Sequence, residues 1–336
     1  MARTAKLRSS LTLAFALCLT AGLLTTASAE VVIKVATLAP ERSAWDKVFR
    51  AFKKDLEKES AGRLSVKIYA GGVQGDEAVV VKKMKTGQIG GGALTAVGLG
   101  AIYPDVLVLQ LPSLFADYKS LDHARDTLRQ EFEREFESRG YVLLGWGDVG
   151  FAHFFSNVPI RTPDDLKKVK MWAWTADPIS GAVASRAGSN PVPLGVPDVL
   201  PSLNTGLIDG FYASPLAAIA LQWFTKAKYM TKDPVALGIG ATVISKAQWD
   251  AIPAEDQAIL RRVADKWHKI LIKKVRQDNA RSFDLLQKQG IQLVDQSAED
   301  KAAWRRLAEG VQKDLVGKVY PQALLDRVKK LASEAR

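Results

Sequence analysis

The stretch KMWAWTADPISGAVASRAGSNPVPLGVPDVLPSLNTGLIDGFYA, residues 170–213, alternates segments typical of strands with segments typical of helices. The pattern predicts strands over 170–174 and 207–213 and an extended segment over 191–194. Helices are predicted over 177–187, where Gly188 supplies a left-handed end, and over 197–204. This strand–helix–strand–helix–strand order is typical of a parallel sheet, whose ligand crevice lies at the carboxyl ends of its strands.

The same alternation occurs nearer the N-terminus. Residues rich in β-branched side chains predict strands over 31–37 and 63–69. Apolar residues at helical spacing predict a helix over 45–60, and a further helix is predicted over 76–85. The N-terminal part is therefore also of the α/β class.

Two junctions between a helix and a strand share a short pattern, Thr-Gly-x-Ile, at residues 86–89 and 205–208. A helix that ends abruptly needs a residue in the left-handed conformation, and glycine adopts it without steric cost. We interpret the match as one unit used twice. It predicts two α/β lobes of similar plan with a cleft between them, an architecture typical of exported solute-binding proteins.

The predicted lobes are not continuous in sequence. Strand-like segments at 140–146 and 242–245 are expected to cross between the lobes, and a helix from 254 to beyond 283 is expected to lie across both. The fold class predicted is α/β, a two-lobed type II-like periplasmic binding protein fold with two parallel or mixed sheets. The expected division is lobe I over 30–145 with about 240–265, lobe II over 146–239 with about 266–297, and a C-terminal helical region over 298–336.

The first 29 residues are predicted to be a cleaved signal peptide. Arg3, Lys6 and Arg8 precede an apolar run over 11–24, and Ala27-Ser28-Ala29 is a small-residue cleavage motif. The run is too short to span a bilayer comfortably, although an uncleaved anchor is the alternative. The signal predicts a periplasmic location for the mature chain. That chain has no disulfide, because the only cysteine, Cys18, lies within the signal.

Composition excludes several other functions. The net charge is +11, but the basic residues are spread along helices such as 47–54, which is typical of solvated helix surface, and no nucleic-acid-binding module is present. The glycine-rich runs at 90–92 and 98–100 match neither a dinucleotide fingerprint nor a phosphate loop. We therefore expect no enzyme activity and no cofactor.

The three histidines are scattered, so we expect no metal site. His153 lies in an aromatic strand and is interpreted as a structural histidine. His123 and His268 lie in predicted helices and are expected at the surface.

Several short segments occur in a recognisable order and spacing, namely GRLSVKIY at 62–69, QGDE at 74–77, LPSLF at 111–115, PI at 159–160 leading into DL at 165–166, NTGLIDG at 204–210, AKYMT at 227–231, and ISK at 244–246 followed by Trp249. With these segments the chain resembles the periplasmic substrate-binding proteins of TRAP transporters, the DctP-like group, from residue 34 to about 329. The resemblance implies two lobes that close on one small molecule. It also implies TRAP membrane permease subunits as partners.

The chain departs from that family where the family binds an organic acid. Trp172 lies where the family places an arginine, Ala152 lies where a second arginine usually occurs, and residues 211–214 replace the usual Glu-Asn-Asn. A carboxylate taken out of water needs a paired charge, whereas tryptophan offers one N–H and a large apolar face. We therefore predict an apolar or aromatic small molecule as ligand, and poor binding of a simple dicarboxylate.

The predicted ligand contacts are Trp45, Phe151, Trp172, Trp174, Tyr212 and Ser214. In this set Trp172 and Tyr212 are expected to form aromatic walls, and Ser214 is expected to provide a polar anchor.

Several alternatives remain open. Trp172 could turn into the core of its lobe, or Lys170 or Arg186 could replace the missing arginine and make the chain a conventional organic-acid binder. The protein could also carry a hydrophobic molecule for a partner other than a TRAP permease, or serve a structural or chaperone role.

Overall fold

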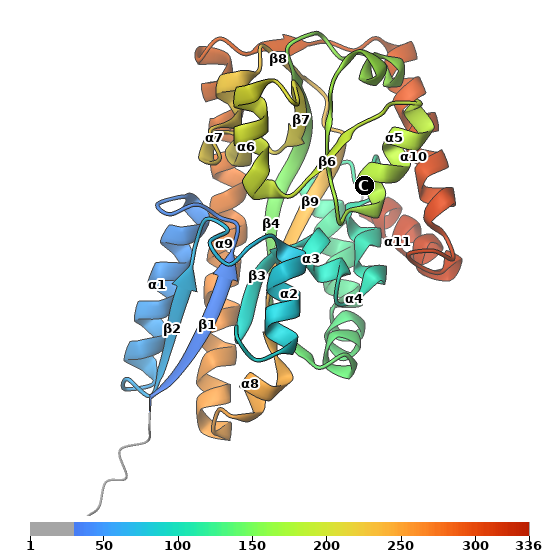
Figure 1. Cartoon of the computed structure of the whole chain (residues 1–336). Helices are drawn as coiled ribbons and strands as arrows, with labels where there is room; N and C mark the ends of the chain where they lie inside the picture. Colours follow the sequence, from blue (N-terminus) through green and yellow to red (C-terminus); the bar gives the residue numbers. More distant parts are fainter. Residues whose placement is uncertain (1–29, 336) are drawn as a thin grey trace, which may run out of the picture.

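The computed structural model describes residues 30–335 (Figure 1). The predicted signal peptide, residues 1–29, lies outside the described residues.

The N-terminal lobe is built on three strands: β1 (Val31–Thr37), β2 (Leu64–Tyr69) and β3 (Gly91–Thr95). β1 lies between the other two and pairs in parallel with both. Helix α1 (Ala44–Glu59) connects β1 to β2, and α2 (Glu77–Lys85) connects β2 to β3. The four of these elements that were predicted, β1, α1, β2 and α2, are confirmed to within a residue or two.

The second lobe contains the segment with which the sequence analysis began. Its elements are β5 (Trp172–Trp174), α5 (Pro178–Ala187), β6 (Val192–Leu194), α6 (Val196–Thr205) and β7 (Gly210–Ala213). β5 and β6 pair in parallel, and a parallel bridge links the residue before β5 to the first residue of β7. The parallel arrangement predicted from the pattern is confirmed.

Two long strands run through both lobes: β4 (Tyr141–Ser156) and β9 (Ala236–Ser245), which pair antiparallel. β9 also pairs with β3 of the N-terminal lobe, while the end of β4 pairs with β7 and with β8 (Tyr229–Thr231). The strand order is β10-β8-β4-β9-β3-β1-β2, with β10 at Gln292–Val294. The two sheets expected from the sequence are thus joined through β4.

The long helix predicted from residue 254 is confirmed as α9 (Ala254–Lys288), which has 35 residues. It packs against α1 of the N-terminal lobe, against β4, and against α7 (Pro215–Ala220) of the second lobe. In Figure 1 it runs behind both lobes. β4, β9 and α9 therefore connect the lobes, whereas the exact lobe boundaries stay a prediction.

The C-terminal helical region is two helices, α10 (Ala298–Leu315) and α11 (Gln322–Glu334). The single run expected from the sequence is interrupted because Gly317 has a left-handed φ of 74° and Pro321 has no N–H to continue a helix. The remaining short and long helices are α3 (Ala96–Gly100), η1 (Pro104–Gln110), α4 (Tyr118–Ser138), η2 (Pro163–Lys168), η3 (Trp223–Lys226) and α8 (Lys246–Asp250).

The repeated junction is present in both lobes. Gly87 follows α2 with φ 72°, and Gly206 follows α6 with φ 73°. In each case the next strand begins four residues later, at Gly91 of β3 and Gly210 of β7. The lobes therefore use the same helix-to-strand turn, as the sequence pattern predicts.

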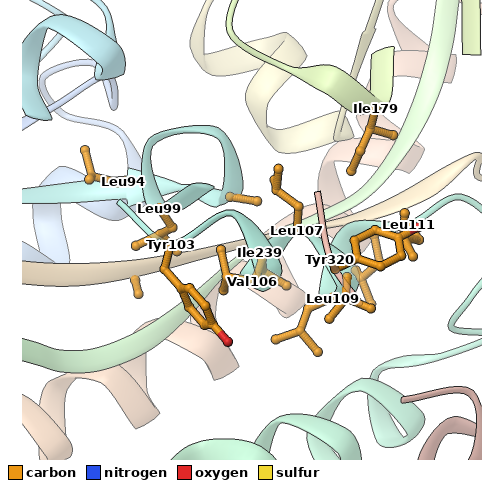
Figure 2. Packing of buried hydrophobic residues seen from close by; sticks show 14 of the residues in the cluster. Leu94, Leu99, Tyr103, Val106, Leu107, Leu109, Leu111, Ile179, Ile239 and Tyr320 are labelled. Carbon is orange, nitrogen blue, oxygen red and sulfur yellow. The ribbon is translucent and has the colours of Figure 1, made fainter. Parts of the chain in front are cut away.

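The largest apolar cluster lies around η1 and reaches into both lobes (Figure 2). Leu107 and Leu109 of η1 are buried together with Ile239 of β9 and Ile179 of α5. Tyr320, between α10 and α11, packs into the same cluster, and its hydroxyl donates to the Gln312 carbonyl at 2.8 Å. This core fixes the positions of β9 and α5, both of which contribute to the site described next.

Candidate ligand-binding site

A cavity of about 210 Å³ lies between the two lobes. The end of β1, the start of α1 and the β3–α3 junction line it on one side, and β5, β7, α7 and η3 line it on the other. The crossing strands β4 and β9 line it between the lobes, with Gly147, Gly238 and Gly240 among the lining residues. The strands pack closely there, because a Cβ on Gly240 would lie 2.8 Å from the Leu94 carbonyl oxygen. We call this space the first cavity.

Four aromatic side chains of the second lobe form one side of the first cavity. This aromatic wall consists of Trp172, Trp174, Tyr212 and Trp223. The Trp172 ring stacks on Tyr212 with centroids 4.8 Å apart and 17° between planes, and it meets Trp223 edge-on at 5.2 Å. Such contacts add about 0.5–1.5 kcal/mol per pair beyond the burial of apolar area. The wall is thus held rigid by its own packing.

Trp172 is 3% exposed and belongs both to the cavity lining and to the apolar core of the second lobe. Its indole N–H donates to the Leu194 carbonyl of β6 at 3.0 Å. The sequence left open whether this side chain faces the cleft or the core. The structure shows that its position serves both.

Trp174 links the two lobes. Its indole N–H donates to the Asp76 carboxylate, the residue that precedes α2, at 2.6 Å. Gly195, before α6, lies against the same carboxylate: a Cβ there would be 3.2 Å from Asp76 Oδ2. The side chain of Trp174 is therefore positioned by a contact across the cleft.

The structure brings four of the predicted contact residues to the first cavity: Trp45, Trp172, Trp174 and Tyr212. Trp45 comes from α1, and its indole N–H donates to the Asp148 carbonyl at 3.3 Å. Ala152, the second replaced arginine position, also lines the cavity. Ligand contact by these residues stays a prediction.

Phe151 and Ser214 lie outside the cavity lining. Successive residues of a strand point to opposite faces, so Phe151 points away from the side that Ala152 occupies and packs on Tyr118, with ring centroids 4.9 Å apart. Ser214 is 1% exposed, and its hydroxyl accepts from the Ala217 N–H as the N-cap of α7. Its cap role explains the serine, and the expected polar anchor is not at this position.

Two buried carboxyl groups line the first cavity without a cationic partner. Glu77 accepts hydrogen bonds from the Thr95 N–H and hydroxyl, each at 2.8 Å, and from the Gly98 N–H at 2.7 Å. Burial nevertheless raises the pKa of Glu77 to about 7. Asp177 caps α5 by accepting from the Ile179 and Ser180 N–H groups, and burial raises its pKa as well.

The expectation that His268 lies at the surface is wrong. It is 7% exposed, with Nδ1 2.7 Å from the Ala264 carbonyl and Nε2 2.8 Å from the Thr242 hydroxyl, and it lines the first cavity. Burial lowers the pKa of His268. The signal was its spacing: Ala264 and Leu271, four residues before and three after, lie on the same buried face of α9. His153 is buried with Nδ1 2.8 Å from the Thr231 carbonyl, as a structural histidine would be.

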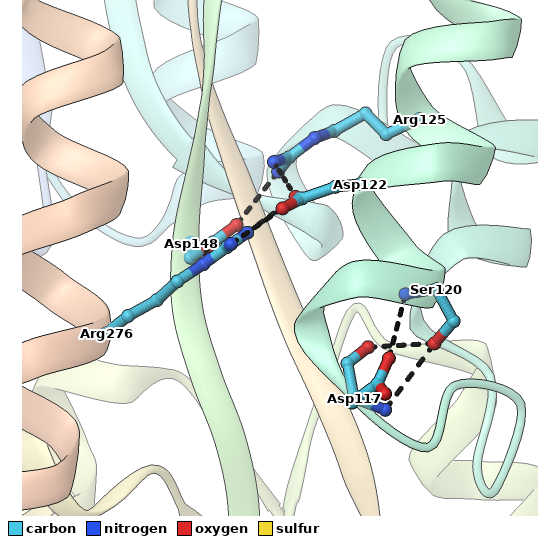
Figure 3. A network of polar contacts seen from close by, with 6 residues as sticks. All are labelled: Asp117, Ser120, Asp122, Arg125, Asp148 and Arg276. Carbon is cyan, nitrogen blue, oxygen red and sulfur yellow. Dashed lines mark hydrogen bonds and ion pairs between the residues drawn. The ribbon is translucent and has the colours of Figure 1, made fainter. Parts of the chain in front are cut away.

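A charged network lies beside the cavity where the lobes meet (Figure 3). It consists of Asp122 and Arg125 of α4, Asp148 of β4 and Arg276 of α9. Asp148 accepts from Arg125 at 2.8 Å and from Arg276 at 2.6 Å, and Asp122 bonds both arginines at 2.6–2.7 Å. The network has two positive and two negative groups. Sequence reasoning missed it because its members are up to 154 residues apart.

Among residues 30–335, no lysine or arginine lines the first cavity. The two cations considered as substitutes are engaged elsewhere: Lys170 donates to the Gly206 carbonyl at 3.0 Å, and Arg186 pairs with Asp314 of α10 at 2.6 and 2.7 Å. Within the same residues, no cluster of three or more His, Cys, Asp or Glu side chains is arranged to hold a metal ion. The first cavity is apolar with a few buried, mostly engaged polar groups.

Comparisons with known proteins agree on one family. Residues 35–318 match the family described as bacterial extracellular solute-binding protein, family 7. A solute-binding protein of Verminephrobacter eiseniae is 28% identical over 279 residues, which cover 80% of this chain and 81% of that protein.

Solved structures show the same fold. A TRAP periplasmic solute-binding protein of Ralstonia eutropha with bound (S)-2-acetolactate superposes with a TM-score of 0.85 at 20% identity, covering 91% of this chain and 99% of that one. The sugar acid binding protein of Advenella mimigardefordensis in complex with galactonate gives 0.84 at 18% identity, covering 92% and 99%. The two-lobed fold and the DctP-like resemblance are thereby confirmed. The chain belongs to the bacterial extracellular solute-binding proteins of family 7, the binding proteins of TRAP-type transporters, which are not enzymes.

Proposed function

We propose that this binding protein takes a small molecule whose apolar or aromatic part fills the first cavity, and that it rejects simple dicarboxylates and sugar acids. One observation carries the proposal: no lysine or arginine of residues 30–335 lines the cavity. The family resemblance, which puts arginines at the positions of Trp172 and Ala152, supports it. The solved relatives from R. eutropha and A. mimigardefordensis hold acids. The proposal is therefore a change of ligand class within the family.

Electrostatics supports this choice. An unpaired carboxylate moved out of water into a protein interior costs several kcal/mol. Glu77 shows the size of the effect in this cavity, because three hydrogen bonds do not prevent burial from raising its pKa to about 7. An acid ligand would bring a second negative charge close to Glu77 and Asp177. An uncharged ring meets no such cost and gains by covering the aromatic wall.

Two of the polar groups at the cavity already have hydrogen-bond partners within the protein, which limits the hydrogen bonds that a ligand could make. The Trp172 N–H is taken by Leu194, and the Tyr212 hydroxyl donates to Asp177 at 3.4 Å. Gln110, the last residue of η1, lines the cavity and has a side-chain amide. We assign to Gln110 the polar anchor role that the sequence suggested for Ser214.

The remaining parts of the proposal concern location and partners. We propose that the chain acts in the periplasm after removal of residues 1–29, and that it passes its ligand to TRAP membrane permease subunits. The motif at Ala27-Ser28-Ala29 supports export. Among residues 30–335 no helix combines the length and the apolar character needed to cross a membrane. Ligand release would use hinge motion at β4, β9 and α9, which connect the lobes.

The test is native mass spectrometry of the purified mature protein, followed by solvent extraction and identification of the bound molecule. We expect a compound with an apolar or aromatic part, together with no measurable calorimetric binding of galactonate at millimolar concentration. A co-purified dicarboxylate or sugar acid, or tight galactonate binding, would show that the missing arginine has been replaced and that the proposal is wrong.

A further inference from the structure

A second cavity, of about 350 Å³, lies between α5, α10 and the loop that follows η1. It adjoins the first cavity, because five residues line both: Gln110, Trp172, Asp177, Tyr212 and Ala236. The stacked pair Trp172 and Tyr212 is thus a wall that the two cavities share.

The second cavity differs from the first in charge. Lys301 and Arg305 of α10 both line it. Lys301 is paired with Asp233 at 2.9 Å, and the two side chains are 44% and 40% exposed. Asp177 also lines the second cavity, but two backbone N–H groups at the start of α5 satisfy its carboxylate. Among residues 30–335, Arg305 forms no ion pair, so one cation at this cavity remains without a carboxylate.

The rest of the second cavity is apolar. Phe154 of β4 and Trp304 of α10 lie with ring centroids 5.3 Å apart, and Met171 and Ile179 add aliphatic surface. Arg305 is exposed, so its charge lies at the solvent side of this apolar space. A carboxylate placed beside it would keep part of its hydration and would avoid the full cost of burial.

We propose that the second cavity is a subsite for the acid group of an elongated ligand, whose apolar or aromatic end occupies the first cavity. The ligand class is then an amphiphilic monocarboxylate. This inference rests on the proposed function, since it assumes that the apolar end fills the first cavity. It places the acid-binding cation on α10, whereas the family arginine would lie on β5 at the position of Trp172.

The experiment is isothermal titration calorimetry with a series of ω-phenylalkanoates, from 3-phenylpropionate to 8-phenyloctanoate, and with the corresponding primary alcohols. We expect one chain length at which the acid binds the unmodified protein at least about tenfold more tightly than its alcohol. We expect Arg305→Gln to abolish this preference without changing the affinity of the alcohol. The control is Arg306→Gln, because Arg306 is exposed on the same helix but does not line the cavity.

The outcomes separate the two proposals. If the alcohols bind and no acid is preferred, or if Arg305→Gln and Arg306→Gln have equal effects, the subsite is wrong while the apolar first cavity stands. If no phenyl compound binds, the proposed function itself is wrong, and the subsite is overturned with it. Both variants change exposed residues, so loss of folding does not obscure the result.

Discussion

The charged network and the aromatic wall border the same cavity but differ in charge. The network consists of paired ionic side chains, whereas the wall consists of uncharged aromatic rings. In the network, Arg125 and Arg276 are within 2.6–2.8 Å of Asp148, and Asp122 completes their pairing. In the wall, Trp172, at a position where the family resemblance predicts an arginine, packs between Tyr212 and Trp223. Both arginines of the network are therefore paired with the protein's own carboxylates. The cavity consequently offers an approaching acid neither an unpaired arginine nor a lysine among the described residues.

The charged network and the aromatic wall also differ in the elements that they connect. The network joins α4 to β4 and α9, two of the elements that connect the lobes. The wall joins only elements of the second lobe, apart from the Trp174 contact to Asp76. Changing the network should therefore alter stability first, whereas changing the wall should alter ligand preference.

The largest effect is expected from Asp148→Ala. This change removes one of the two carboxylates that Arg125 and Arg276 share, leaving only Asp122, and Arg125 is only 3% exposed. We expect the free energy of unfolding to fall by about 3–5 kcal/mol, measured by urea denaturation. The control is Asp314→Ala, which breaks the exposed pair with Arg186 and should lower the free energy of unfolding far less, because water screens exposed ion pairs. Equal losses in the two variants would mean that the network is no stronger than a surface pair.

The next effect concerns pH and Glu77. Because burial raises its pKa to about 7, the folded chain holds this proton more tightly than the unfolded chain. Its contribution to stability is fully present below its ordinary pKa of about 4.5 and is lost as the pH rises through about 7. The loss is up to about 3.5 kcal/mol, from about 2.5 pKa units at about 1.4 kcal/mol per unit.

The measurement compares urea unfolding of the unmodified protein and Glu77→Gln at pH 5 and pH 8. We expect the stability of the unmodified protein relative to the variant to decrease between the two pH values. His153 and His268, whose pKa values are lowered by burial, titrate in both proteins and cancel in the difference. A difference that does not change with pH would mean that Glu77 keeps an ordinary pKa.

A smaller effect is expected when arginines are introduced at positions 172 and 152, where the family resemblance predicts them. In the double variant Trp172→Arg, Ala152→Arg, two cations are placed in the first cavity, and a carboxylate gains a charge-assisted partner there. We expect galactonate to bind at least about tenfold more tightly than to the unmodified protein, a gain of about 1.4 kcal/mol. Calorimetric titration of the double variant and of each single variant provides the test. No gain in the double variant would place acid binding elsewhere in the molecule.

The smallest effect is expected from Trp174→Phe, which keeps an aromatic ring, although a smaller one, but removes the hydrogen bond to Asp76. The loss is about 1 kcal/mol of contact between the lobes, so affinity for the co-purified ligand should fall several-fold. Trp267→Phe is the matched control, because its indole N–H also donates to a carboxylate, Asp55, at 2.8 Å, but away from the cavity. An equal fall in affinity for both variants would show that the Trp174 bond has no special role in holding the ligand.

Features that depend on local rules were predictable from the sequence. Gly188 ends α5 with φ 62°, and the glycines at 87 and 206 repeat the same left-handed turn, because no other residue adopts that conformation as readily. Strand β1 and the long helix α9 follow from side-chain pattern alone. The end of α10 was also signalled, by Gly317 and Pro321, but the amphipathic pattern on either side hid the interruption.

Features that depend on distant parts of the chain were not predictable. The joining of the sheets through β4 requires knowledge of strand pairing, which side-chain alternation does not specify. Phe151 was placed in the site although its neighbour Ala152 occupies the cavity side of the strand. The neutralisation of Arg276 by Asp148 depends on residues 128 apart. The resemblance therefore indicated which family arginines this chain lacks. It could not show where the chain's own arginines lie or which carboxylates they pair with.

The N-terminal lobe cannot complete its sheet until β9 has been synthesised, because β9 pairs with β3 of that lobe. The inner edge of β3 is completed only by β9, with Gly91 paired to Ile244, and β1 and β2 lie beyond it. A nascent or truncated chain that ends before residue 236 would expose the backbone of β3 as an unpaired strand edge, which favours aggregation. Pairing over such long sequence separations also makes folding slow. The N-terminal lobe is therefore not a folding unit separable from β9, and we expect residues 30–235 alone to aggregate when expressed.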